Sequence, residues 1–149
     1  RAAQGQDPDP IMAGPHAMTP RAPVYFLVDT LEYLQKGGRI GGAAALIGSV
    51  LQVKPILELR EGRVEPLERE RTERKALARL KEMVLAGAAH GPESRLSVLH
   101  AGAPDAARAL ADDLGRQLAV PDGMIMELTP AIVTHAGPGV LGVGFFAPD

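Results

Sequence analysis

From residue 24 onward, short apolar runs alternate with amphipathic stretches. Residues 24–28 are β-branched and aromatic, which is typical of a buried strand. Asp29 and Glu32 have the spacing of a capping box, and they predict a short helix that ends at Gly37-Gly38, where glycine tolerates a left-handed backbone. The folded part is therefore expected to begin with a strand followed directly by a short helix.

The middle of the chain carries two strand patterns and one helix pattern. Residues 55–59 and 63–70 predict a hairpin around the turn Glu61-Gly62, and Pro66 favours an edge position for the second strand. Residues 72–86 predict an amphipathic helix. Its apolar face is expected to contain Leu77, Leu80 and Val84.

The last third predicts a strand–helix–strand passage. Residues 96–99 form a strand pattern, and Pro104 suits the first position of a helix because its missing N–H costs nothing there. The buried face of this helix is expected to comprise Ala107, Leu110, Ala111, Leu114 and Leu118. Residues 124–128, 131–134 and 140–146 predict further strands. The expected fold is α/β or α+β, with a mixed sheet flanked by helices.

Two segments do not follow these periodicities. Residues 1–23 hold five prolines and no apolar period, so they are predicted to be a linker or inter-domain arm, and residues 24–149 to be the folded domain. Residues 41–52 have almost no polar face. If helical, this segment is expected to be buried on most sides or to line an apolar cavity.

Composition narrows the function classes. A length of 149 residues allows one domain, and a net charge of −2 gives no general attraction to nucleic acid. The absence of cysteine excludes disulfides and thiolate sites and suits a reducing compartment. Apolar stretches of about 13 residues are below the roughly 18 of a membrane span. No histidine pair has metal-site spacing, so neither a metal nor a cofactor is expected.

A glycine-rich segment surrounds one arginine at Gly37-Gly38-Arg39-Ile40-Gly41-Gly42. Glycines let backbone amides approach a ligand, and a guanidinium suits a carboxylate or phosphate, which predicts an anion site. The segment matches neither common phosphate-loop motif. A helix stop and tight turn with a solvated arginine explain the same residues, so both interpretations stand.

A single histidine precedes a rigid turn at His135-Ala136-Gly137-Pro138-Gly139. A histidine held at a strand end can donate to an anionic ligand or act as a base. A histidine that only caps the turn is about as plausible from spacing alone.

Charged residues gather between Glu65 and Lys75, including Arg71 and Arg74. Interspersed signs are typical of a solvated face. A partner-docking edge is the alternative interpretation.

Three segments together resemble the C-terminal half of DegV-family proteins, which are bacterial fatty-acid-binding proteins. The segments are residues 34–40, residues 46–57, and residues 135–139 with Gly142 downstream. Their order and spacing agree over about 125 residues. The resemblance implies a two-domain α/β protein about twice this length, of which the N-terminal domain is missing here, and a cytoplasmic location.

The resemblance also implies roles for individual residues. His135 is expected to hydrogen-bond the fatty acid carboxylate and Arg39 to lie close to it. The ligand-binding set is expected to be His135, Arg39, Gly38, Ile40, Gly137 and Gly139. Some members of the family are acyl carriers of a fatty acid kinase, so Arg71 and Arg74 are expected to meet such a kinase subunit. Many relatives have Ser-Arg where this chain has Gly41-Gly42, which weakens the kinase prediction more than the lipid prediction.

The nearly continuous apolar face of residues 43–57, together with Phe145 and Phe146, is expected to line a slot for a long-chain fatty acid. This chain is expected to bind the fatty acid without catalysing a reaction. Two other classes remain open from the sequence. One is a phosphate- or nucleotide-binding enzyme domain that uses the glycine-rich segment, and the other is a regulatory domain without a ligand.

Overall fold

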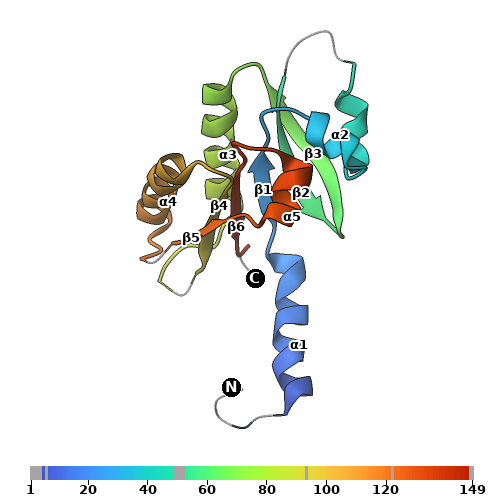
Figure 1. Ribbon diagram of the computed structural model, residues 1–149. Coiled ribbons are helices and arrows are strands. Elements are labelled where there is room, and N and C mark those ends of the chain that lie inside the picture. Colours follow the sequence, from blue (N-terminus) through green and yellow to red (C-terminus); the bar gives the residue numbers. More distant parts are fainter. Residues whose placement is uncertain (1–4, 6, 49–52, 93, 122, 148–149) are drawn as a thin grey trace.

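A computed structural model describes residues 5, 7–48, 53–92, 94–121 and 123–147 and shows one six-stranded mixed sheet in the order β3-β2-β1-β6-β4-β5 (Figure 1). The strands are β1 (Val24–Leu27), β2 (Lys54–Arg60), β3 (Arg63–Glu70), β4 (Leu96–His100), β5 (Met124–Glu127) and β6 (Leu141–Phe145). All neighbouring strands are antiparallel except β4 and β5, which are parallel. The predicted fold class is confirmed.

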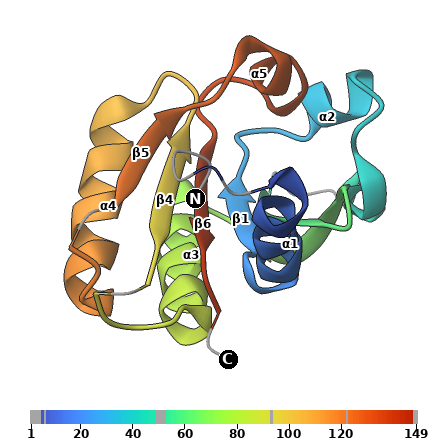
Figure 2. The ribbon, with the colours of Figure 1, turned by 90° about the horizontal axis from the view of Figure 1, so that it is seen from below.

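Helices lie on both faces of this sheet, and the N-terminal helix projects away from it (Figure 1 and Figure 2). They are α1 (Pro8–Met18), the 3-10 helix η2 (Thr19–Arg21), α2 (Glu32–Lys36), the 3-10 helix η3 (Gly41–Leu46), α3 (Glu73–Gly87), α4 (Pro104–Leu118) and α5 (Pro130–Ala136). None of the helices in the described ranges is long and apolar enough to cross a membrane.

Helices α3 and α4 cover one face and enclose the main core. The predicted face of α4 is fully confirmed, because its five apolar residues are all buried. On α3 the buried residues are Ala76, Leu80 and Val84, whereas Leu77 is half-buried. Thr72 caps α3 by accepting a hydrogen bond from the Lys75 backbone N–H. This layer is a conventional packed core that holds the sheet rigid.

The predicted hairpin β2–β3 is confirmed, with its turn at Glu61-Gly62. Both residues have positive φ, 50° and 74°, as a type I′ turn requires. β3 is an edge strand, and the pairing register shifts beside Pro66, where a missing N–H is tolerated. Arg79 of α3 binds both oxygens of Glu68 at 2.7 Å and ties the helix to this edge.

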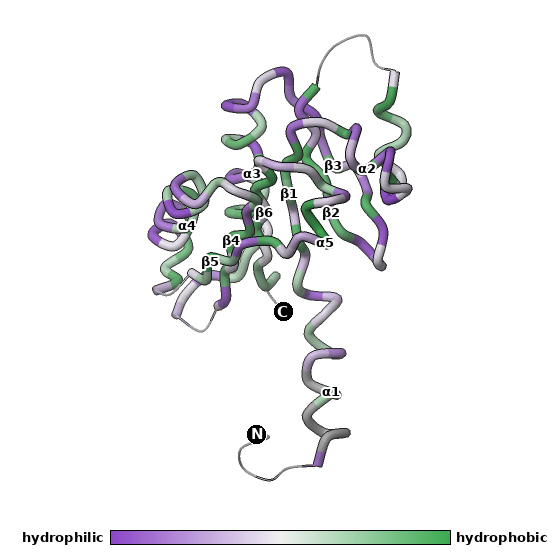
Figure 3. Tube along the Cα trace, in the orientation of Figure 1, coloured by the Kyte–Doolittle hydropathy of each residue, from purple (hydrophilic) through white to green (hydrophobic). Residues whose placement is uncertain are grey.

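In the part of the chain that the structure describes, the opposite face carries only short elements, α2, η3 and α5. They enclose a second, smaller cluster of buried residues with partly buried neighbours around it. Its buried members are Val28, Leu34, Ala43, Leu57, Ala101, Ala136 and Val140. Apolar side chains stay exposed around this layer, and the tube coloured by hydropathy shows green strands at the centre of the molecule (Figure 3). The second face is therefore only partly covered.

Three local predictions are wrong. Residues 131–134 belong to helix α5, not to a strand, because Pro130 starts a helix and the Thr134 hydroxyl donates to the Pro130 carbonyl at 2.8 Å. Asp29 does not cap α2, whose N-cap residue is Leu31; its carboxylate pairs with Lys54 instead.

Helix α1 is the third difference, since no regular element was predicted for residues 1–23. Pro8 opens the helix at a position where proline is tolerated, and Pro15 lies inside it. Figure 1 shows α1 projecting away from the body of the molecule. Whether residues 1–23 form an inter-domain arm stays a prediction.

Candidate functional site

A cavity of about 910 Å³ lies on the partly covered face of the sheet. Strand residues form its floor, including Phe26 of β1, Leu99 of β4 and Gly142 of β6, which the register places side by side. Its sides come from α2, η3, α5 and the β2–β3 hairpin. The full lining comprises Val24, Phe26, Leu34, Gly38, Arg39, Gly41, Gly42, Leu59, Gly62, Arg63, Val64, Glu65, Leu99, Leu128, Ala131, Ile132, His135, Ala136, Val140 and Gly142.

The cavity combines apolar and charged walls. Phe26, Leu59, Leu99 and Ile132 contribute hydrocarbon surface, and Leu59 and Ile132 are 50% and 49% exposed. Arg39, Arg63 and His135 are the basic side chains of the lining, opposed by one carboxylate, Glu65. An apolar cavity with a few polar groups is the usual form of a small-molecule site.

Helices α2 and α5 fit together through two glycines. A Cβ added to Gly37 would lie 2.1 Å from Nδ1 of His135, and one added to Gly137 would lie 2.6 Å from the ring of Tyr33. Each helix thus places an aromatic ring over a glycine of the other. Gly37 has an ordinary φ of −79°, so it is the space for the His135 ring that requires a glycine there.

His135 lies in the last turn of α5 and lines the cavity. Its Nδ1 atom is buried and has no hydrogen-bond partner among the described residues. One edge of the ring is therefore turned into the protein against Gly37. The predicted position of this histidine at a strand end is wrong, because His135 lies at a helix end.

The glycine-rich segment lies beside the same cavity. Gly38 follows α2 with a φ of +65°, as the predicted helix stop requires, and Arg39 is exposed at the cavity edge. Gly41 and Gly42 pack closely on β3: added Cβ atoms would lie 2.3 Å from the Val64 carbonyl oxygen and 2.0 Å from the Glu65 carboxylate. The segment therefore closes the side of the cavity between α2 and β3.

The predicted site residues divide into two groups. Arg39, Gly38 and His135 meet at the cavity, although they come from segments about 100 residues apart. Three others are not part of its lining: Ile40 packs into the second core cluster, Gly137 is buried against Tyr33, and Gly139 donates its N–H to the Ala101 carbonyl. Their ligand contacts stay predictions.

Two further predictions concern residues outside this cavity. Arg71 and Arg74 are exposed where β3 joins α3, and they are not part of the lining. Phe145 was expected in the slot, but it is 4% exposed in the main core, edge-on to Tyr25 at 5.1 Å. The expected slot wall of residues 43–57 is also wrong for its described part, because none of residues 43–48 and 53–57 lines the cavity; residues 49–52 lie outside the described residues.

Sequence reasoning missed Gly37 as a contact of His135, and it missed Phe26, Leu99 and Arg63 as lining residues. Phe26 and Leu99 alternate with core-facing neighbours along their strands, so the period of two was the available signal. No local signal connects Gly37 with His135, because that contact exists only in the folded chain.

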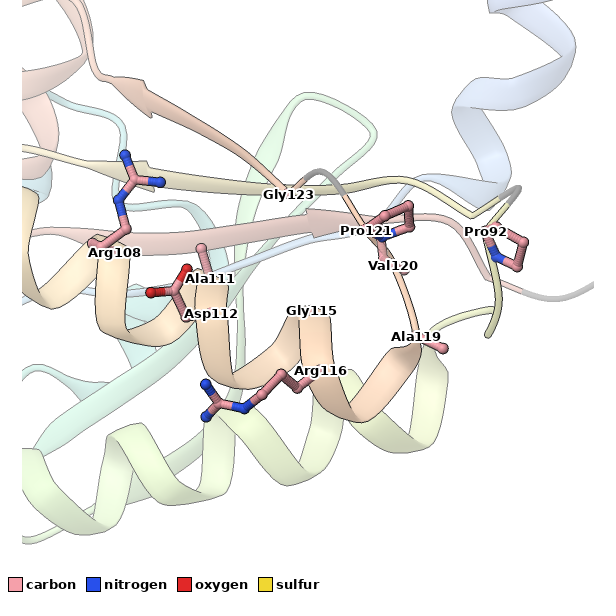
Figure 4. A pocket seen from close by; sticks show the side chains of 10 residues that line it. All are labelled: Pro92, Arg108, Ala111, Asp112, Gly115, Arg116, Ala119, Val120, Pro121 and Gly123. Atoms are coloured by element: carbon pink, nitrogen blue, oxygen red, sulfur yellow. The ribbon is translucent and has the colours of Figure 1, made fainter.

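A second hollow, of about 730 Å³, lies along α4 (Figure 4). Its charged residues are Arg108, Asp112 and Arg116, and Figure 4 shows the two arginines extending to different sides of the helix. Arg116 is directed to Asp113 at 3.5 Å. The charges do not converge on one point, so this hollow is the weaker candidate.

Comparison with known proteins gives one consistent family. The family model described as "Uncharacterised protein, DegV family" matches residues 1–148. A DegV domain-containing protein of Streptomyces coelicolor is 52% identical over 120 residues, which cover 80% of this chain and 42% of that protein.

Solved structures agree. One reported for fatty acid binding of a DegV family protein from Thermus thermophilus has a TM-score of 0.87 and 36% identity, over 99% of this chain and 53% of that chain. A fatty-acid-binding DegV family protein from Streptococcus agalactiae has a TM-score of 0.83 and 32% identity, over 99% and 52%. The chain thus spans about half the length of the proteins it matches.

Proposed function

The chain belongs to the DegV family, and from this premise we propose that it forms one wall of a site for a long-chain fatty acid. The carboxylate lies at the end of the cavity that holds His135 and Arg39, and the hydrocarbon tail lies against Phe26, Leu59 and Leu99. The single observation that carries the proposal is one continuous cavity that is apolar along the sheet and carries basic side chains beside α2 and α5, with Arg63 and Glu65 as further charged groups on the hairpin side.

The state of His135 supports a donor role toward an anion. A proton on Nδ1 would be a buried donor without an acceptor, which costs about 1–3 kcal/mol. The neutral ring therefore carries its proton on Nε2. Because Nδ1 faces Gly37 while the ring lines the cavity, Nε2–H is the donor available to a carboxylate.

Arg39 supplies the charge at the same end. It is exposed at the cavity edge, and the described part of the chain shows no ion-pair partner for it. A guanidinium that is free of an internal carboxylate can pair with that of a ligand. His135 would then set the position of the head group, and Arg39 would neutralise it.

The tail supplies most of the affinity in this proposal. Burying about 14 methylenes at about 0.8 kcal/mol each is worth on the order of 11 kcal/mol before ordering costs. A bound phosphate or nucleotide would leave this apolar wall without a partner. The cavity therefore fits an acyl chain better than it fits the phosphate-binding alternative.

The wall requires a second domain to close it. Leu59, Met124, Met126 and Ile132 are 41–56% exposed around the open face, and the chain spans about half of its relatives. We propose that the N-terminal domain of the DegV fold covers this face and completes the contacts to the carboxylate. Residues 1–23, with helix α1, would then be the inter-domain arm, and residues 24–149 the lipid-binding domain.

In this proposal the protein binds the fatty acid and catalyses no reaction itself. A separate fatty acid kinase subunit would phosphorylate the carboxylate presented at the cavity mouth, and Arg71 and Arg74 would contribute to its docking. Gly41-Gly42 in place of the Ser-Arg of many relatives removes one basic contact, so weaker coupling to a kinase is expected.

Native mass spectrometry of the complete protein, including any residues that its gene encodes before Arg1, tests this function. A mass increment equal to a C14–C18 fatty acid is expected after expression in a bacterial host. A protein that stays ligand-free after incubation with fatty acids, or that binds nucleotides instead, would contradict the proposal.

The head-group assignment needs a separate comparison. His135→Ala is expected to weaken palmitate binding by about 1.5–3 kcal/mol, the range for a hydrogen bond to a charged group. Hexadecanol has the same chain without the charge, so its affinity should change much less. Equal losses for both ligands would refute a carboxylate role for His135.

A further inference from the structure

The centre of the open sheet face lacks side chains where most sheets carry them. Gly142 and Gly144 alternate along β6, which lies between β1 and β4. The alternate residues of the same strand point to the opposite face, because Leu141, Val143 and Phe145 belong to the main core. The two glycines therefore face the side that carries the cavity.

Neither glycine is required by the backbone. Both have φ values outside the left-handed region, and added Cβ atoms would meet only side-chain or backbone neighbours at 3.3 Å or more. For Gly142 these are Phe26 Cβ at 3.3 Å, the Tyr25 carbonyl oxygen at 3.4 Å and Leu99 Cβ at 3.5 Å, so a methyl group there needs a small shift of its neighbours. For Gly144 they are Val24 Cγ2 at 3.7 Å and Ser97 Cβ at 4.0 Å, which are ordinary contacts. A glycine in a central strand normally lowers the stability of the fold, so the presence of glycine at these two positions needs another explanation.

The missing side chains produce a channel one strand wide. On one side Phe26 and Val24 project from β1, and on the other Leu99 and Ser97 project from β4. Phe26, Leu99, Val24 and Gly142 all line the cavity. The channel is thus continuous with the floor of the proposed fatty-acid site, and Gly144 and Ser97 lie next along the strands, just beyond the cavity lining.

The chain direction relates this channel to the head-group end. β6 begins five residues after Ala136, the last residue of α5, and runs away from the helix that holds His135. Gly142 therefore lies nearer the basic end, and Gly144 lies about 7 Å farther along the strand at about 3.4 Å per residue. Positions along β6 correspond to positions along a bound chain.

We propose that the acyl chain lies in this channel along β6, and that the absence of side chains at Gly142 and then at Gly144 determines how long a chain the site accepts. The proposal rests on the proposed function and adds the path of the tail and the residues that measure it. A single-file channel also favours an unbranched hydrocarbon.

The test measures affinities of the complete protein and its variants for octanoate, myristate and stearate. Gly144→Val is expected to leave octanoate binding within about threefold and to weaken stearate binding at least tenfold. Gly142→Val is expected to weaken myristate and stearate alike, since the obstruction lies closer to the head group. His135→Ala serves as the contrast, because a head-group loss is the same factor for every chain length.

The outcomes separate this inference from the proposed function. If the unmodified protein binds none of the three acids, the proposed function fails. If it binds them and Gly144→Val causes no loss, or the same loss at every length, the path along β6 is wrong although the function stands.

Folding of the variants is controlled in two ways. Gly142→Ala and Gly144→Ala introduce smaller groups and are expected to show the same order of effects at smaller size, with thermal midpoints close to that of the parent. Independently, a stearate carrying a diazirine at its methyl end is expected to label β6, β1 or β4. Labelling that avoids all three strands would overturn the proposal without any substitution.

Discussion

Gly37→Ala is the substitution that most directly tests how the fold positions its candidate head-group residue. The new methyl carbon would lie 2.1 Å from His135 Nδ1 and 3.0 Å from Cε1. To reach ordinary contact at 3.4 Å, the ring has to move by about 1.3 Å. The backbone itself tolerates alanine, because φ at Gly37 is −79°.

The energetic consequences fall on binding more than on folding. Alanine reduces the entropy of the unfolded chain, which is worth about 0.4–1 kcal/mol, while overpacking costs about 1–3 kcal/mol. A net destabilisation of about 1–2 kcal/mol is expected. A hydrogen bond to a charged group is worth about 1.5–3 kcal/mol, so its loss should weaken carboxylate binding by about 10- to 150-fold.

The assay compares palmitate with hexadecanol and records the nitrogen chemical shifts of the imidazole by NMR. The unmodified protein should show His135 protonated on Nε2, and the variant should show altered shifts together with a loss confined to palmitate. Gly123→Ala is the matched control, because an added Cβ there meets its nearest neighbour at 3.6 Å. Unchanged imidazole shifts and palmitate affinity in Gly37→Ala would refute the reasoning.

Three further predictions concern the scaffold. Asp113 accepts hydrogen bonds from Lys81 and Gln117, which lower the pKa of its carboxyl, so these contacts stabilise the fold above the unfolded pKa of about 3.9 and the stability is lost as the pH falls through the lower folded pKa. In urea unfolding, Asp113→Asn should be about 0.5–1 kcal/mol less stable than the parent at pH 7 and equally stable near pH 2. An equal difference at both pH values would contradict this. Leu114→Ala removes a fully buried side chain between α4 and the sheet and should cost about 2–5 kcal/mol in the same assay, with a loss below 1 kcal/mol speaking against the assigned core. Glu61→Asn should stabilise the fold by about 0.5 kcal/mol and so raise the thermal midpoint, since asparagine tolerates the left-handed backbone that Glu61 adopts at φ 50°. A lowered midpoint would exclude a type I′ turn.

The sequence predicted an element correctly where the interacting residues lie close together along the chain, or where an apolar pattern repeats over several turns. Fifteen residues of α4 repeat an apolar stripe and begin at a proline, so its first residue and its buried face could both be predicted. The β2–β3 hairpin was equally clear, because its turn requires residues that adopt positive φ. Both elements express a rule that acts within a few residues.

The errors occurred where a local pattern was short and a nonlocal contact decided. Ile132 and Val133 favour a strand by composition, but Pro130 starts a short helix there and the Thr134 hydroxyl stabilises it. Asp29 has the right spacing for a cap, yet Lys54, 25 residues away, takes its carboxylate. Neither outcome could be read from a window of neighbouring residues.

The glycines of the candidate site show the same limit in a more useful form. In the sequence, the pair Gly37-Gly38 reads as one helix-stop signal, whereas the two residues are glycine for different reasons. Gly38 needs its left-handed backbone, and Gly37 needs room for a ring that arrives from a helix 98 residues later. Only the first reason has a local signature.

The reasons for these glycines therefore make different demands on substitution. A residue that tolerates positive φ, such as asparagine, can replace Gly38 at little cost, but no side chain can replace Gly37 without moving His135. Gly142 is different again, because Phe26 would have to shift by only a few tenths of an ångström to admit a methyl group, and the main loss would appear when a ligand occupies the channel. Gly37→Ala should therefore lower both the stability of the fold and the affinity for the fatty acid, whereas Gly142→Ala should lower mainly the affinity. If every glycine were needed only for stability, the loss of affinity would follow the loss of stability in both variants.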